Sequence, residues 1–204
     1  MKMELADNSQ AFPGILNKWQ TDIHHEIRFW WSWVARHQDE IRHLYKTPIM
    51  ELPNFLKLEL GNKNPSNLSI MELGPGPVPQ LGDHFNGCPI TYVAVDALAD
   101  EYAAIFHHYN IRQRFDIIAA TGEELTQHFA AESFDVIYSS NALDHTFDPA
   151  LIIKNMFTLL KPGGVIYLAA CRNEGEIENY HGLHQWNFDL YHNRLILWGK
   201  TGIN

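Results

Sequence analysis

The chain has 204 residues, 46% of them hydrophobic, and a formal net charge of −9. That length allows one domain with a substantial core, and the acidic balance disfavours nucleic acid and anionic membrane surfaces as partners. The two cysteines, Cys88 and Cys171, form no C-x-x-C motif, and residues 1–10 lack the apolar core of a signal peptide. No apolar run reaches the roughly 18 residues of a membrane span. We therefore expect a cytoplasmic protein with no membrane partner.

The first third of the chain has helical patterning. Apolar residues recur there at spacings of three and four: Ile23, Ile27, Trp30, Trp31 and Val34. This spacing predicts an amphipathic helix, and GNKNPSN (61–67) predicts a loop after it. We therefore expect an N-terminal helical extension over residues 1–67, which either packs as core or forms a lid over a ligand site.

From residue 68 onward, short β-rich runs alternate with helical segments. The runs are LSIMEL (68–73), ITYVAVDA (90–97), FDIIAA (115–120), FDVIYSS (134–140), GVIYLAA (164–170) and RLILWG (194–199). Helices are predicted over 96–109 and over 149–164, where Asp148 and Pro149 mark a helix start. This alternation predicts an α/β fold with a mostly parallel sheet covered on both faces. Because the chain stops soon after RLILWG, we expect the last strand or strands to be missing.

The first β-rich run leads into a turn rich in glycine and proline, ELGPGPVPQLG (72–82). A nucleoside triphosphate loop requires a Lys after its last glycine, and none follows here. A dinucleotide site requires a third glycine where Pro79 stands, and amide donors that Pro75 and Pro77 lack. Glu72 would also repel a diphosphate. An ordinary exposed loop and a site for a positively charged ligand are the two remaining interpretations, and the second one accounts for Glu72.

The turn resembles that of class I S-adenosylmethionine-dependent methyltransferases, in which an acidic residue precedes two alternating glycines. Glu72, Gly74 and Gly76 match this pattern, whereas the family's common third glycine is absent. Further matches follow in the family's order: VAVDA (93–97), ATGEEL (120–125), FDVIYSSNALDHTFDP (134–149) and LLKPGGVIYL (159–168). The resemblance implies a Rossmann-like three-layer α/β/α sandwich over residues 68–204. It also implies S-adenosyl-L-methionine, which carries an ammonium and a sulfonium but no phosphate, as the cofactor.

The resemblance also implies cofactor contacts. Asp96 would accept hydrogen bonds from the ribose hydroxyls, although it is also placed to cap the following helix. Thr121 and Glu124 have the spacing of a capping box, which we favour over a contact between Thr121 and adenine. The predicted cofactor-binding residues are Glu72, Gly74, Gly76, Asp96, Ala97, Thr121, Gly122, Glu123 and Asn141.

Methyl transfer to oxygen and to many nitrogen acceptors requires a base, and histidine suits this role at neutral pH. The candidate bases are His145, His181 and His184, and Asp144 is available to orient a neighbouring imidazole. Each histidine also has a purely structural interpretation, because the chain contains 12 of them. The H-x-x-H spacing of His181 and His184 fits a metal, but no further ligand pattern accompanies it and we expect none.

The segment NEGEIENYHGLHQWNF (173–188) follows the fifth β-rich run, where methyltransferases of this class place substrate loops. It contains side chains suited to a polar, aromatic-walled pocket: Glu174, Glu176, Tyr180, Trp186 and Phe188. We therefore expect a methyltransferase acting on a small-molecule or sugar-like acceptor. The alternatives are a non-catalytic or regulatory S-adenosylmethionine-binding protein of this fold and, opposed by Glu72 and Pro79, a nicotinamide-dependent reductase.

Overall fold

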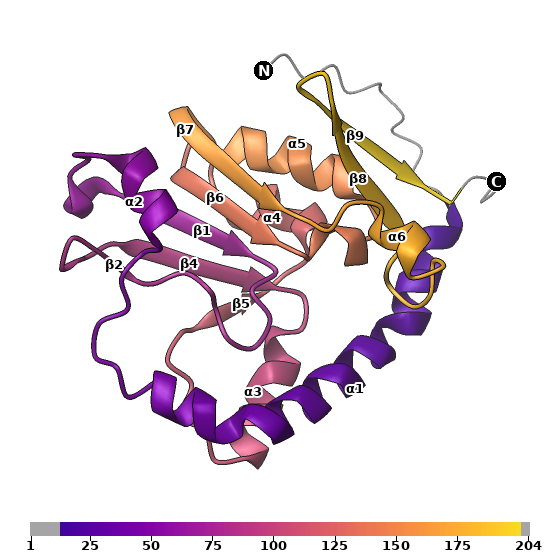
Figure 1. Cartoon of the computed structure of the whole chain (residues 1–204), viewed down its shortest axis with the longest axis horizontal. Helices are drawn as coiled ribbons and strands as arrows, with labels where there is room; N and C mark the ends of the chain where they lie inside the picture. The colour runs from indigo at the N-terminus through magenta and orange to yellow at the C-terminus, as the bar shows by residue number, and fades with distance from the viewer. Residues whose placement is uncertain (1–12, 201–204) are drawn as a thin grey trace.

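The computed structural model describes residues 13–200, and its centre is a five-stranded parallel sheet with helices on both faces (Figure 1). Residues 1–12 and 201–204, at the outer limits of the two predicted domains, lie outside the described residues. The helices are α1 (Pro13–Leu44), α2 (Asn54–Leu60), α3 (Ala99–His108), α4 (Leu125–His128), α5 (Pro149–Leu159) and α6 (Glu174–Ile177). The strands are β1 (Ser69–Leu73), β2 (His84–Phe85), β3 (Cys88–Pro89), β4 (Thr91–Asp96), β5 (Ile117–Ala119), β6 (Phe134–Ser140), β7 (Leu160–Ala169), β8 (Trp186–Tyr191) and β9 (Arg194–Gly199).

The order of the strands in the central sheet is β5-β4-β1-β6-β7. The chain moves outward from β1 to β4 and β5, and then returns to the other side of β1 with β6. Ligands bind at such a reversal, outside the carboxyl ends of the strands. Leu73, the last residue of β1, pairs with Val95 on one side and with Ser139 on the other. The segments after β1, β4 and β6 therefore begin side by side.

The two faces of the sheet bury different sets of side chains, because successive residues of a strand point to opposite faces. Met71 and Ile137 belong to a cluster with α4 and α5. Ile70 and Val136 belong to a second cluster, in which α2 contributes Leu56 and Leu60. A third cluster joins α1 and α3 beside β5. These layers confirm the three-layer α/β/α sandwich with an N-terminal helical extension.

The connection between β1 and β4 differs from the strand–turn–helix unit typical of such turns. No helix lies between these strands, and the chain instead forms a loop and the short β2–β3 pair. Pro75, Pro77 and Pro79 explain this, because proline lacks the amide that a helix interior requires. Helix α2, which precedes β1, covers the sheet face there.

Helix α1 runs along the side of the sheet at which the parallel strands end (Figure 1). The predicted apolar stripe is confirmed: Val34 is fully buried, and Trp30 and Trp31 pack in the cluster shared with α3. The Trp30 ring meets Tyr102 edge-on at 5.9 Å. Towards its N-terminal end the helix reaches a different part of the protein, because the His25 ring lies 5.7 Å from that of His181.

The last β-rich run is a strand, but it lies outside the central sheet. RLILWG forms β9 and pairs antiparallel with β8, which the sequence analysis did not predict. The two turn residues, His192 and Asn193, both have positive φ, as a type I′ turn requires. That tight turn joins the strands directly. Within residues 13–200 no strand pairs with the outer edge of β7, and no helix is both long and apolar enough for a membrane span.

Candidate active site

A cavity of about 330 Å³ lies at the carboxyl ends of the strands. It is lined by α1, by the segments after β1, β4, β5 and β6, by Ile152 of α5, and by Cys171, Glu174, Leu183 and His184. Most of the residues predicted for the site line it: Gly74, Gly76, Asp96, Ala97, Thr121, Gly122, Glu123, Asn141, His145 and His184. Glu72 and His181 do not. The predicted residues that meet at the cavity therefore come from five segments that are far apart in the sequence: those after β1, β4, β5 and β6, and the loop before β8.

Glu72 faces away from the cavity and organises the loop that replaces the missing helix. The residue is 1% exposed, and its carboxylate accepts hydrogen bonds from the amides of Gln80 and Leu81, at 2.9 and 3.0 Å, and from the Tyr92 hydroxyl at 2.7 Å. Burial raises the pKa of the Glu72 carboxyl, while these three donors oppose the rise. The predicted attraction between Glu72 and a cationic cofactor is corrected here, because the carboxylate anchors the proline-rich loop.

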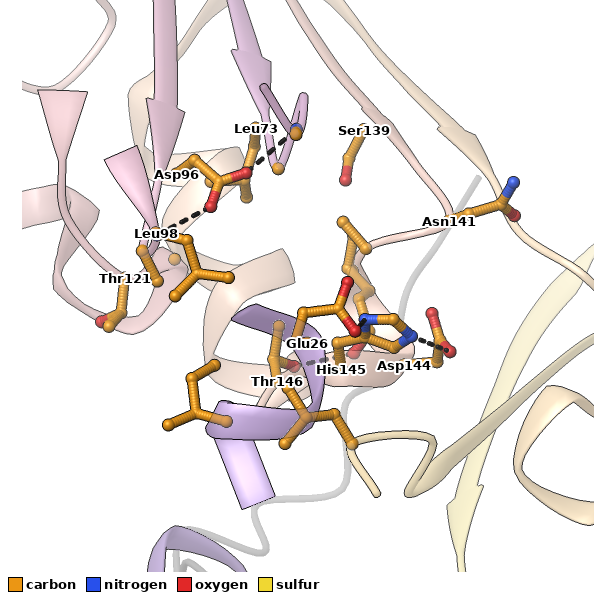
Figure 2. A pocket seen from close by; sticks show the side chains of 18 of the residues that line it. Glu26, Leu73, Asp96, Leu98, Thr121, Ser139, Asn141, Asp144, His145 and Thr146 are labelled. Carbon is orange, nitrogen blue, oxygen red and sulfur yellow. Dashed lines mark hydrogen bonds and ion pairs between the residues drawn. The ribbon is translucent and has the colours of Figure 1, made fainter. Parts of the chain in front are cut away.

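Asp96 holds the glycine turn against the end of β4. Its two carboxylate oxygens accept hydrogen bonds from the amides of Gly76 and Leu98, at 3.0 and 2.9 Å (Figure 2). The bond from the Leu98 amide fixes the turn that leads into α3, but α3 itself has no side-chain cap, so the alternative interpretation of Asp96 as a helix cap is wrong. The Asp96 carboxylate also lines the cavity. Burial raises the pKa of the Asp96 carboxyl, against the effect of the two amides.

The predicted capping box at Thr121 is absent. The Thr121 side chain accepts no backbone amide, and its hydroxyl instead donates to the Glu124 carboxylate at 3.1 Å. Glu123 fixes the next segment along the cavity wall, because its Oε1 accepts the amides of Phe147 and Asp148 at 3.0 and 2.9 Å. Asn141 lies at the rim, where its side chain is exposed and directed away from Asp96 (Figure 2).

Replacement of Glu123 by Gln is expected to stabilise the protein at alkaline pH. Burial raises the pKa of the Glu123 carboxyl to about 7, so its ionisation weakens folding as the pH rises from about 4.3 through 7. Glutamine keeps the Oε1 acceptor and removes the charge. We expect Glu123→Gln to increase the free energy of unfolding by about 1–3 kcal/mol near pH 8 and to leave it nearly unchanged near pH 5. Urea unfolding at both pH values measures this, and an equal effect at both would contradict it.

Asp144, His145 and His184 form a polar cluster at the other end of the cavity. His184 Nδ1 lies 2.8 Å from Asp144 Oδ2 and 3.0 Å from His145 Nε2, and His145 Nε2 lies 3.3 Å from Asp144 Oδ2. The hydrogen bond to the Asp144 carboxylate raises the pKa of His184. On the opposite side of the His145 ring, Nδ1 lies 3.7 Å from Glu26 Oε2 (Figure 2). Asp144 thus orients the two imidazoles, whereas the exposed His181 lies outside the cavity.

Several lining residues were not predicted as site residues. Helix α1 contributes Trp19, Ile23, Glu26, Phe29 and Trp30. Their spacing of three and four residues indicated one face of a helix, but not what that face would contact. Ser139 and Cys171 also line the cavity, and so does Glu174, which the sequence analysis placed in the substrate pocket. Of the predicted aromatic pocket after β7, Trp186 and Phe188 are instead buried in the main hydrophobic core, because they alternate inward on β8.

A family model described as a methyltransferase domain matches residues 36–198. The chain belongs to this family. S-adenosyl-L-methionine is its cofactor, and the cavity of this methyltransferase domain fits that molecule. Its lining includes five carboxylates and, among the described residues, no Lys or Arg: Glu26, Asp96, Glu123, Asp144 and Glu174. Such a wall suits an ammonium and a sulfonium and would repel a diphosphate. The buried Ser139 hydroxyl has no partner among the described residues and offers a further contact to a ligand.

Two curated relatives of the methyltransferase domain are much larger proteins, and the chain matches only a small part of each. A polyketide synthase–nonribosomal peptide synthetase of Aspergillus clavatus is 28% identical over 109 residues, which are 50% of this chain and 3% of that protein. A reducing polyketide synthase of Botryotinia fuckeliana is 29% identical over 120 residues, which are 55% of this chain and 5% of that protein. Among solved structures, the trans-methyltransferase CalH complexed with SAH is 23% identical, with a TM-score of 0.43, over 63% of this chain and 38% of that chain.

Proposed function

We propose that the chain transfers a methyl group from S-adenosyl-L-methionine to a small, oxygen-bearing molecule such as a sugar-like acceptor. The observation that carries this proposal is the position of the Asp144–His145–His184 cluster, which lines the same cavity as Asp96 and the glycine turn. One cavity thus holds a predicted site for the cofactor and a group able to activate an acceptor. The five acidic side chains of the wall support a polar acceptor over an apolar one.

In this proposal each part of the cavity has one task. The bound cofactor supplies an electrophilic methyl group on a positively charged sulfur. Asp96, held by the Gly76 and Leu98 amides, accepts hydrogen bonds from the ribose hydroxyls of the cofactor. The acidic side chains of the wall attract the positively charged cofactor and so contribute to its binding. The cluster of Asp144, His145 and His184 promotes loss of the acceptor proton.

Helix α1 acts as the lid in this proposal. Trp19, Ile23 and Trp30 form an apolar face over the cavity, and exclusion of water protects both the methyl group and the deprotonated acceptor. The two-part division of the chain near residue 67 and the cytoplasmic location stay predictions. No nucleic-acid partner is proposed, because the cavity wall is acidic.

Calorimetric titration with S-adenosylmethionine, S-adenosylhomocysteine and NADH tests the site. We expect micromolar binding of the first two and no binding of NADH. In an acceptor screen, His184→Gln is expected to retain binding of S-adenosylhomocysteine and to lower turnover by about 10²–10⁴-fold. Binding of NADH alone would favour a reductase. Binding of S-adenosylmethionine with no turnover on any acceptor would favour a regulatory protein of the same fold.

A further inference from the structure

We propose that Asp144, His145 and His184 bind a divalent transition-metal ion, and that this ion activates the acceptor. The three residues come from two segments, the short turn Leu143–His145 and the loop before β8, and all three line the cavity. The role of the ion in catalysis rests on the methyl transfer proposed above, but its binding does not. From the sequence we expected no metal, because only His181 and His184 had a suitable spacing. In the structure His184 instead lies beside His145 and Asp144 of the segment after β6.

The spacing of the three ligand atoms is that of neighbouring ligands on one ion. Asp144 Oδ2, His145 Nε2 and His184 Nδ1 form a triangle with sides of 2.8, 3.0 and 3.3 Å. Bonds of about 2.0–2.1 Å from zinc to nitrogen and oxygen place tetrahedral ligand atoms about 3.3 Å apart. Adjacent ligands of an octahedral ion at that bond length lie about 2.9 Å apart. Two sides of the triangle, 3.0 and 3.3 Å, lie within this range before any ion is present, and the third, 2.8 Å, lies just below it.

Protons alone satisfy at most two sides of this triangle. A neutral imidazole has one N–H, and the other ring nitrogen only accepts. Suppose that His184 Nδ1 carries a proton and donates it to Asp144. If His145 Nε2 is unprotonated, its contact with Asp144 joins two acceptors. If His145 Nε2 is protonated, its contact with His184 Nδ1 joins two donors. If His145 Nε2 donates to His184 Nδ1, the contact between His184 and Asp144 joins two acceptors. A cation in contact with all three atoms attracts each of their lone pairs, and this attraction outweighs the repulsion between them.

The ligand set selects the class of ion. Two imidazoles and one carboxylate suit zinc and related first-row ions, whereas magnesium and calcium prefer oxygen ligands throughout. Three protein ligands leave a coordination position for an acceptor, as in catalytic zinc sites. Glu26 of α1 places a carboxylate near the second ring nitrogen of a ligand, with Oε2 3.7 Å from His145 Nδ1, which is longer than a hydrogen bond. That carboxylate favours the tautomer in which Nε2 is free to bind metal.

The ion accounts for acceptor activation without a free base. An acceptor hydroxyl bound at the open position has a lowered pKa and loses its O–H proton to solvent. The oxygen lone pair then attacks the methyl carbon, and the carbon–sulfur bond breaks with its electron pair left on sulfur. The products are the methyl ether and neutral S-adenosylhomocysteine. With both imidazoles bound to the ion, neither is available to take the proton itself.

Metal titration of the untagged protein tests this site directly. After treatment with a chelator and its removal, Zn²⁺ is titrated by calorimetry, and Co²⁺ provides a visible absorption spectrum that reports its ligands. We expect one ion per chain, with His145→Gln, His184→Gln and Asp144→Asn each weakening binding at least 10-fold. The matched control is His43→Gln, at an exposed histidine of α1 outside the cavity, for which we expect unchanged binding and an unchanged Co²⁺ spectrum.

The possible outcomes separate the two proposals. No Zn²⁺ binding, or binding that none of the three substitutions weakens, overturns the metal site. Because Asp144 is buried, Asp144→Asn is checked by circular dichroism, and the two partly exposed histidines carry the test if this variant fails to fold. If the protein binds S-adenosylhomocysteine but does not bind Zn²⁺, the metal site is overturned and the proposed methyl transfer is unaffected. Binding of Zn²⁺ with no methyl transfer on any acceptor leaves the metal site and removes its proposed role.

Discussion

Asp96→Ala is expected to weaken binding of S-adenosylhomocysteine by at least about 100-fold. Hydrogen bonds to a charged group are worth about 1.5–3 kcal/mol each, and every 1.4 kcal/mol is tenfold in affinity. The substitution would remove the carboxylate that we assign to the ribose hydroxyls. It would also release the Gly76 amide, which Asp96 holds at 3.0 Å, so the glycine turn would lose its anchor on β4. Calorimetric titration measures the affinity.

Asp100→Ala is the matched control for this experiment. Asp100 is an exposed carboxylate in the first turn of α3, four residues after Asp96, and it lies outside the cavity. Its loss changes the net charge by the same amount, so an effect common to both variants would reflect long-range charge. Thermal unfolding of both variants shows whether the fold survives. Unchanged affinity in a folded Asp96→Ala variant would contradict the assignment of Asp96.

Gly74→Ala is expected to lower the free energy of unfolding by about 2–5 kcal/mol, the largest effect on stability that we predict. Two costs combine. Gly74 has a φ of +68°, where a side chain costs about 1–2 kcal/mol. A Cβ at this position would also lie 2.3 Å from the Cβ of Ala142, so the segment after β6 must shift. That segment carries Asp144 and His145, and we therefore expect cofactor binding to weaken as well.

Two further variants separate these costs. Gly87→Ala is a control with a φ of +77° and no atom within 4 Å of the added Cβ, so it is expected to show only the conformational cost. In the double variant Gly74→Ala/Ala142→Gly the steric conflict is absent, and we expect about 1–3 kcal/mol of the loss to be recovered. Urea unfolding measures all of them. Equal losses for Gly74→Ala and Gly87→Ala would show that the contact between Gly74 and Ala142 is unimportant.

The sequence predicted the central sheet well because its strands are buried on both faces. Runs such as FDVIYSS are continuously apolar at their centre, and Val136 and Ile137 are both fully buried, one on each face. Parallel strands also align their carboxyl ends, so residues that follow different strands meet. For this reason the sequence alone places Gly74, Asp96 and Thr121 at one edge of the sheet.

The local connections were harder to predict. The prolines after Gly74 exclude a helix there. From them we argued against a dinucleotide as the ligand, but we did not predict that the helix between β1 and β4 would be absent. β8 was missed because residues 186–188, Trp-Asn-Phe, were assigned to a substrate loop. In the structure these three residues alternate between the two faces of β8. Trp186 and Phe188 point into the main hydrophobic core, and Asn187 lies on the other face.

The polar cluster lies beyond what spacing along the chain reveals. His184, in the loop before β8, contacts Asp144 in the turn Leu143–His145. His181, only three residues before His184, is exposed. Glu26 meets His145 from the first helix. Neighbours in sequence separate and distant residues meet because the turn before β8 reverses the chain. Only the folded arrangement shows this.

The position of α1 has a consequence for the order in which the protein acquires its structure during synthesis. This helix leaves the ribosome before every element that it covers, and isolated helices are marginally stable in water. Its apolar face, which includes Trp19, Ile23 and Trp30, has no surface to cover until α3 and the segments after β6 and β7 have been made. The nascent chain therefore exposes this tryptophan-rich segment to water until those elements have been made.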